Sequence, residues 1–296
     1  MTTTADVQTT SLDVTGPYDL AEVALMGFGH RDEREFDGVM RMAFCLDGDY
    51  ETPVGVEARQ SGSTVELTVH GPPDRLADVA HQVARVISLD HDGAAFDAIC
   101  RRDPVLARLH AVAPGFRPAL FYSPYEAAVW SVVSARRARG QGIALRQRIC
   151  EQYGTTFDLA GQRVAALPTP SQLLAVESAP GLPADRVPRL HAIARAATEG
   201  RLGADRLRAL DPAEAERELQ QLPGIGPFYS SLIVVRGCGH ADVLAVEGHA
   251  REAVEELYGI DHELSVVELE ELAESWRPFR TWVLVSARAL GGRLAA

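Results

Sequence analysis

The sequence predicts an α+β protein, in which a small antiparallel sheet-plus-helix module is followed by a mostly helical region. Strand-like alternation of apolar and polar residues is confined to the first third of the chain, where residues 54–59 and 64–70 flank the turn Ser61-Gly62. Farther along, helix-start signals recur instead. A length of 296 residues with 46% hydrophobic content is enough to bury a sizeable core.

The N-terminal part of the chain divides into a tail and a module. Residues 1–16 are rich in threonine and lack an apolar stretch, so we expect a disordered tail. Residues 17–90 form the predicted α/β module. Residues 39–46 are expected to add a strand to the hairpin. Residues 76–89 carry apolar side chains at helical spacing and predict an amphipathic helix.

Residues 91–296 predict two helical subdomains with a cleft between them. Ser123 precedes Pro124 and Glu126, a combination typical of a helix N-terminus. Asp211 and Ser265 are also capping residues with a glutamate three positions later, and each predicts another helix N-terminus. Two glycines lie where helices are expected to end, Gly259 and Gly291.

Composition excludes several kinds of chemistry. The sequence contains no lysine, so all 29 basic residues are arginines, and neither a P-loop lysine nor a lysine Schiff base is available. The formal net charge of -12 argues against broad coating of DNA but leaves room for a local basic site. The four widely spaced cysteines form no zinc or iron–sulfur pattern, which favours a reduced cytoplasmic protein. No apolar run is long enough for a membrane span.

One short motif joins two predicted helices. Pro223 ends the first helix, Gly224 and Gly226 permit a tight turn, and Pro227 opens a second helix that extends to about residue 236. Ile225 is expected to point between the helices. Backbone N–H groups at such a turn suit a phosphate, with a possible bridging monovalent cation. The simpler interpretation is a plain corner between two helices.

Several stretches taken together resemble the helix-hairpin-helix DNA glycosylase superfamily, and in particular its bacterial 3-methyladenine DNA glycosylase II branch. The order and spacing agree from about residue 16 to the C-terminus. The matching stretches are residues 123–129, the turn from Leu222 to Gly226, residues 242–244 and residues 273–281.

The resemblance implies a function and a partner. Such enzymes flip a damaged nucleotide out of double-stranded DNA, and the hairpin holds the phosphates. The implied activity is that of a monofunctional DNA N-glycosylase that excises alkylated purines such as 3-methyladenine in base excision repair. Lyase relatives carry their catalytic lysine where this sequence has Phe228. The resemblance further implies a monomer that needs no cofactor and no iron–sulfur cluster.

The sequence departs from the family at the catalytic position. The aspartate that stabilises the sugar cation in relatives falls on Gly248, and Glu247 directly precedes it. In one interpretation, Glu247 has taken over the role of the missing catalytic aspartate. In the other, the carboxylate is lost and the protein is a catalytically silent or altered-specificity relative that binds damaged DNA. Glu247 could also simply stabilise the start of the following helix.

Further residues are candidates by their position in the resemblance. Arginines after the helix that begins at Pro124 form the densest basic cluster and are expected to contact DNA, unless they only solvate a helix face. These arginines are Arg136, Arg137 and Arg139. Candidates for the base pocket are Phe228, Tyr229, Tyr122, Trp130 and Arg288. For Phe228 and Tyr229, core packing is the alternative, and relatives carry an aromatic residue at the position of Arg288.

Overall fold

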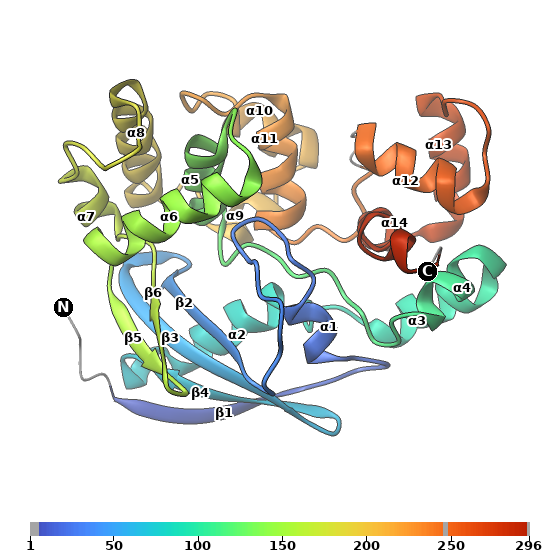
Figure 1. Ribbon diagram of the computed structural model, residues 1–296, viewed down its shortest axis with the longest axis horizontal. Helices are drawn as coiled ribbons and strands as arrows, with labels where there is room; N and C mark the ends of the chain where they lie inside the picture. Colours follow the sequence, from blue (N-terminus) through green and yellow to red (C-terminus); the bar gives the residue numbers. More distant parts are fainter. Residues whose placement is uncertain (1–5, 245–247, 295–296) are drawn as a thin grey trace.

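The N-terminal module is a twisted four-stranded antiparallel sheet with a helix against one face. The computed structural model describes residues 6–244 and 248–294 (Figure 1). The strand order is β1-β4-β3-β2. The buried faces of the sheet and of the helix share one apolar core. The elements are β1 Val7–Asp13, α1 Leu20–Ala24, β2 Met40–Leu46, β3 Asp49–Ser61, β4 Thr64–His70, η1 Pro73–Arg75 and α2 Leu76–Val86.

Strand β1 overturns the expectation of a disordered tail over residues 1–16. Residues 7–13 pair with β4 in an antiparallel register that joins Val7 to His70 and Asp13 to Thr64. The strand lies at the sheet edge and none of its side chains is buried, and Val7 is 58% exposed. Backbone hydrogen bonds to β4 hold it, and composition does not reveal such bonds.

Two apolar clusters form the helical region, and Figure 1 shows them as separate groups of helices above the sheet and to its right. The first cluster is continuous in sequence. It comprises α5 Pro124–Ser134, α6 Arg139–Tyr153, α7 Pro170–Leu174, η2 Ala184–Arg186, α8 Val187–Thr198, α9 Ala204–Arg208, α10 Pro212–Leu219, α11 Pro227–Leu232 and the π-helical turn η3 Ile233–Gly237.

The second cluster joins helices that are far apart in sequence. Helices α3 and α4 precede the first cluster along the chain but pack against the C-terminal helices. Trp276 and Trp282 are buried in this core. The cluster comprises α3 Gly93–Arg102, α4 Pro104–Ala111, α12 Gly248–Tyr258, α13 Val266–Ala273, η4 Glu274–Trp276 and α14 Arg280–Leu294.

Two features of the helical region differ from the sequence-based expectation. A short hairpin, β5 Thr156–Leu159 with β6 Gln162–Ala165, packs Phe157 against the module, and this contact leaves no room for a side chain at Gly55. Gly291 lies inside α14 and not beyond its end. The helix continues to Leu294, and its last turn is fastened where Arg293 pairs with Glu22 at 2.7 Å.

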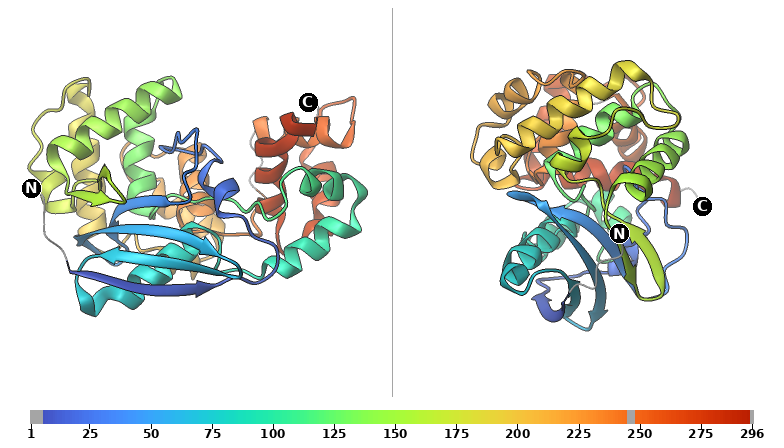
Figure 2. Two further views of the ribbon diagram at one scale, coloured as in Figure 1. Left: turned by 60° about the horizontal axis from the view of Figure 1, so that its bottom comes forward. Right: turned by 90° about the vertical axis from the view of Figure 1, so that its left-hand side faces the viewer.

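Polar contacts fasten the module to the first helical cluster, and the two lie stacked in both views of Figure 2. Arg85 pairs with Asp47 at 2.6 Å and donates to the Gly237 carbonyl at 2.6 Å. The Tyr50 hydroxyl donates to the Leu202 carbonyl at 2.6 Å. These buried contacts make the module an integral part of the molecule. Across residues 6–244 and 248–294, no helix combines the length and the apolar character needed to cross a bilayer.

Candidate active site

The turn between α10 and α11 is built as the sequence predicts. Gly224 adopts φ +93°, and the Ile225 N–H donates to the Leu222 carbonyl at 3.0 Å. Leu222 and Ile225 are both buried in the first helical core. Gly226 is the N-cap of α11. The turn is therefore a tight connection whose apolar side chains fix the angle between the two helices.

Backbone donors at this turn are open to a ligand. The N–H groups of Gly224, Gly226, Phe228 and Tyr229 have no hydrogen-bond acceptor among the described residues. The Cδ atom of Arg189 lies 3.1 Å from the position that a Cβ would occupy at Gly224, so a guanidinium group borders the turn, and this group also pairs with the exposed Asp185 at 3.1 Å. Open N–H groups with an adjacent positive charge are suited to an anion such as a phosphate.

A cavity of about 680 Å³ opens next to the start of α11, between the two helical clusters. We call it the cleft cavity. Its walls come from α5, α11, the turn η3, the start of α12, α14 and one loop of the N-terminal module. The predicted site residues that line it are Trp130, Arg136, Arg137, Arg139, Phe228, Tyr229 and Arg288.

Aromatic rings are prominent in this cavity. Phe228 is 54% exposed although it is apolar, and its ring packs edge-on against Tyr229 at a centroid distance of 5.1 Å. Trp130 is almost fully buried in the opposite helix, α5, and only borders the cavity. An apolar ring that is left open at the mouth of a cavity is available to stack on a planar ligand.

The N-terminal module supplies a wall that sequence reasoning missed. Phe28 lines the cleft cavity and packs on Phe121 at 4.9 Å, and the Arg236 guanidinium lies 3.6 Å from the Phe28 ring centroid. Gly27 and Gly29 on either side both have positive φ. A side chain at Gly29 would collide with Phe121, since a Cβ there would lie 2.6 Å from Cε1. The only sequence signal was this Gly-Phe-Gly triplet, and periodicity does not detect it.

The three predicted DNA-binding arginines lie together but differ in their contacts. Arg137 donates to the Gly181 carbonyl at 2.8 Å. Arg139 donates to Asp32 at 3.2 Å and to the Gly29 carbonyl at 3.3 Å, so it also fastens the loop that carries Phe28. Arg136 is exposed, has no partner among the described residues and adopts φ +56°. A left-handed conformation at a residue other than glycine is strained and is often found at functional sites.

The residues on either side of the predicted catalytic segment are held by hydrogen bonds or belong to a helix. Glu247 itself lies outside the described residues. Upstream, Asp242 accepts from Arg280 and from Arg277, each at 2.8 Å. The Thr281 hydroxyl oxygen accepts a hydrogen bond from the Val243 N–H at 3.0 Å. Downstream, Gly248 is the first residue of α12, and Ala250 in its first turn lines the cleft cavity. The first turn of α12 therefore lies at the edge of this cavity.

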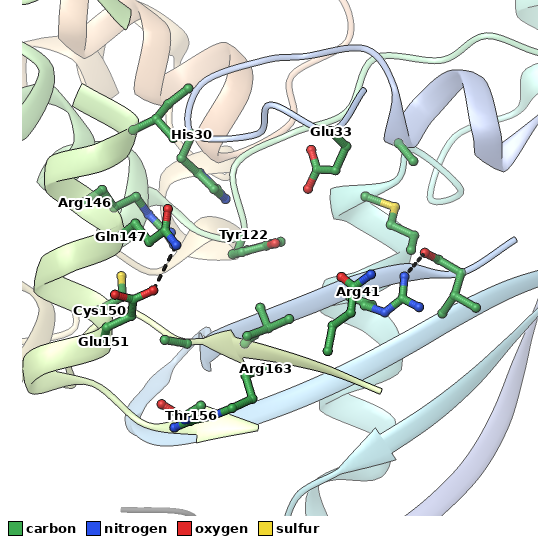
Figure 3. A pocket seen from close by; sticks show the side chains of 18 of the residues that line it. His30, Glu33, Arg41, Tyr122, Arg146, Gln147, Cys150, Glu151, Thr156 and Arg163 are labelled. Carbon is green, nitrogen blue, oxygen red and sulfur yellow. Dashed lines mark hydrogen bonds between the residues drawn. The ribbon is translucent and has the colours of Figure 1, made fainter. Parts of the chain in front are cut away.

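Tyr122 is not brought to the cleft. It is buried among the core residues of the module and lines a second cavity, of about 830 Å³, between the sheet, α6 and the β5–β6 hairpin (Figure 3). We call this the module cavity. Burial raises the pKa of the Tyr122 hydroxyl to about 12. Because the segment before Ser123 runs toward the sheet, Tyr122 lines the module cavity whereas Trp130 borders the cleft cavity.

Some of the charged groups in and beside the module cavity form ion pairs. Glu126 is buried and accepts from Arg146 at 2.8 Å, and Arg41 pairs with Asp37 at 2.7 Å. The His30 Nδ1 atom lies 3.8 Å from the Glu126 Oε2 atom, and the His30 side chain points into the cavity in Figure 3. Burial raises the pKa of Glu126, while burial and the nearby Arg146 lower that of His30.

Comparisons with known proteins identify similar enzymes, although no family model matches the chain. The sequence is 27% identical over 197 residues to DNA-3-methyladenine glycosylase 2 of Escherichia coli, and the match covers 64% of this chain and 67% of that protein. The fold is similar to that of the 3-methyladenine DNA-glycosylase of Archaeoglobus fulgidus, with a TM-score of 0.75 and 21% identity over 94% of this chain and 97% of the other.

A second solved structure has a different base specificity. It is the 8-oxoguanine glycosylase/lyase of Clostridium acetobutylicum in complex with double-stranded DNA, with a TM-score of 0.65 and 16% identity over 98% of this chain and 99% of the other. The shared architecture thus extends over almost the whole of both chains. The hairpin and the sequence relatives agree with this likeness of fold, so the chain is similar to helix-hairpin-helix DNA glycosylases in sequence and in architecture.

Proposed function

We propose that the protein is a monofunctional DNA N-glycosylase that excises alkylated purines, such as 3-methyladenine, in base excision repair. One observation carries the proposal: the aromatic cleft cavity lies between the start of α12 and a hairpin whose open backbone N–H groups are suited to an anion. A phosphate site, a base pocket and a catalytic segment are the parts that base flipping requires side by side.

Contact with the DNA backbone rests on few groups. The open N–H groups at the turn from Gly224 to Tyr229 and the nearby Arg189 are suited to hold phosphates. The exposed Arg136 extends the positive surface to the cavity mouth. This local arrangement explains how a chain with a net charge of -12 can bind DNA. We also expect a monovalent cation to bridge the hairpin and a phosphate.

The chemistry is a hydrolysis at the sugar. The bond between C1′ and the base nitrogen breaks, and its electron pair leaves with the base. Positive charge builds on the sugar and is stabilised by a carboxylate, for which Glu247 is our candidate. Water then adds to C1′, and its proton is released to solvent. Without lysine, no lysine Schiff base can form, so we expect the product to be an intact abasic site.

Base release from methylated duplex DNA by the purified protein tests this function. Glu247→Gln removes the charge and keeps the size, and it should lower the rate by about 100-fold or more. Glu252→Gln is the matched control, because Glu252 is an exposed carboxylate of α12 that pairs with His249 at 3.2 Å. That variant should keep the wild-type rate.

Two results would change the proposal. Unchanged release by Glu247→Gln would remove this residue from the mechanism. No release by the wild-type protein, combined with tight binding to a duplex that contains an abasic-site analogue, would favour the alternative of a catalytically silent relative, in which Gly248 marks the loss of the catalytic carboxylate.

We expect the protein to act as a cytoplasmic monomer without an organic cofactor. The four cysteines are free thiols in buried positions, which is suited to a reducing compartment. Size-exclusion chromatography coupled to light scattering tests the monomer. Base release with and without potassium tests the cation at the hairpin.

A further inference from the structure

Arg139 connects two parts of the molecule that are far apart in sequence. It is the first residue of α6, three positions after the exposed Arg136, and its side chain reaches a loop of the N-terminal module. This loop, residues 26–32, carries Phe28 to the wall of the cleft cavity. A single side chain therefore joins the segment that we expect to face DNA to one wall of the cavity.

The Arg139 guanidinium uses all three of its nitrogen atoms on this loop. Nε donates to the Gly29 carbonyl at 3.3 Å, Nη1 donates to the Asp32 carboxylate at 3.2 Å, and Nη2 donates to the Arg31 carbonyl. Two of the three acceptors are backbone carbonyls, so the contact fixes the path of the main chain. The planar fork of a guanidinium can span such a set of acceptors, whereas a lysine ammonium is a single point of contact.

These contacts surround Phe28 in the loop. The Arg31 N–H donates to the Phe28 carbonyl at 2.9 Å, so the stretch that Arg139 binds is a closed turn that begins at Phe28. On the other side, a Cβ at Gly27 would lie 3.8 Å from Nη2 of Arg139. The guanidinium therefore lies against both neighbours of Phe28 and not against its ring.

The loop has a second anchor, which faces the core of the module. The Arg31 side chain is buried, donates to the Leu120 carbonyl at 2.9 Å, and lies 4.8 Å from the centre of the Tyr122 ring. This anchor does not depend on α6. Loss of the Arg139 side chain should therefore leave the loop attached to the module and free the stretch that borders the cleft cavity.

We propose that Arg139 is a positioning residue, which holds the Phe28 wall of the cleft cavity in place against the start of α6, and is not a contact to DNA. The inference rests on the proposed glycosylase function and adds a residue to that site. Three of the five N–H donors of the guanidinium are already used on the loop. A wall that shifts by about an ångström holds a flipped base in a less reactive geometry.

The first test measures base release from methylated duplex DNA by Arg139→Met, Phe28→Ala and the double variant. Arg139→Met should lower kcat by about fivefold or more and leave KM for the duplex almost unchanged. In the Phe28→Ala background the same change should have little further effect, because no ring is left to position. Arg139→Lys should not restore kcat, since one ammonium group cannot replace the fork.

The second test needs no reaction. Amide hydrogen exchange of residues 26–32, which include the bonded Arg31 N–H, should be faster in Arg139→Met than in the wild type. Arg163→Met is the matched control for both tests, because Arg163 is an exposed arginine on β6 that lines the module cavity. It should match the wild type in kcat, in KM and in exchange.

The outcomes separate the inference from the proposed function. A raised KM with an unchanged kcat in Arg139→Met would make this residue a DNA contact and overturn the inference, as would additive effects of Arg139→Met and Phe28→Ala. If the wild-type protein releases no base, the glycosylase function fails. Hydrogen exchange then decides: faster exchange of residues 26–32 in Arg139→Met supports the positioning role, and unchanged exchange overturns it.

Discussion

The two cavities of the molecule differ in the share of their arginines that pair with a carboxylate. In and beside the module cavity, Arg146 and Arg41 each meet a carboxylate, at 2.8 Å and 2.7 Å. In the cleft cavity, Arg139 pairs with Asp32 at 3.2 Å, whereas Arg136 and Arg288 have no such partner among the described residues. Paired charges satisfy each other and fasten the sheet to the helices. Arginines without a carboxylate partner are suited to an anionic ligand, as the proposed function of the cleft cavity requires.

The largest expected effect comes from breaking a pair in the module cavity. Arg146→Met leaves the buried Glu126 carboxylate without its partner and should lower the free energy of unfolding by about 3–5 kcal/mol. Arg288→Met in the cleft should change it by less than about 0.5 kcal/mol. Urea denaturation measures both. The double variant Glu126→Gln/Arg146→Met should recover part of the loss, and similar losses in the two single variants would end the distinction.

A smaller effect is expected for the loop that separates the cavities. Phe28→Ala removes a half-buried ring and should cost about 2 kcal/mol of stability. It should also slow base release by tenfold or more, because the cleft loses a wall. Phe36→Ala, on the same loop but lining the module cavity, is the matched control. It should lower stability to a similar degree and leave base release intact, and a comparable drop in release would show that the two cavities act as one.

Acid should weaken the module cavity through His30. Its pKa is lowered in the folded protein by burial and by Arg146, Arg31 and Arg139. The unfolded chain therefore binds a proton first as the pH falls below about 6.5, and folding stability decreases by up to about 1.4 kcal/mol per pH unit. His30→Gln should flatten this slope between pH 7 and pH 5. Arg288→Met should keep the wild-type slope. A slope unchanged in His30→Gln would assign the acid sensitivity to other histidines.

The smallest effect is a gain. Arg136 holds φ +56°, so Arg136→Gly should relieve strain and raise the free energy of unfolding by about 1 kcal/mol. The same change removes an exposed charge from the cavity mouth. Binding to an abasic-analogue duplex should weaken, and its dependence on salt should become shallower by roughly one unit of log–log slope. Unaltered binding would exclude Arg136 from the DNA interface.

The parts that local sequence specifies were predicted well. The capping residues Ser123, Asp211 and Ser265 start helices as expected, because their side chains accept from N–H groups only two or three residues away. The α+β class follows from the change in apolar spacing near residue 90. Gly224 has the positive φ that its tight turn required.

The parts that depend on distant contacts were not predictable. Strand β1 depends on β4, whose paired residues lie about 50 to 60 positions farther along the chain, and its own composition suggested a tail. Tyr122 and Trp130 are eight residues apart and line different cavities, since the chain bends at Ser123. Phe28 reaches the cleft through packing on Phe121. Such positions are set by tertiary contacts, and no local pattern encodes them.

The loop with the Gly-Phe-Gly triplet also bears on how far this chain could be shortened. Its first part, Met26 to Gly29, borders one cavity, and its continuation, from His30 to Val39, borders the other. A fragment that retained only the helices would keep the hairpin and lose one wall of the cleft cavity. Engineered truncations and exchanges of the N-terminal module with relatives therefore need to carry residues 26–39 along with the helical part.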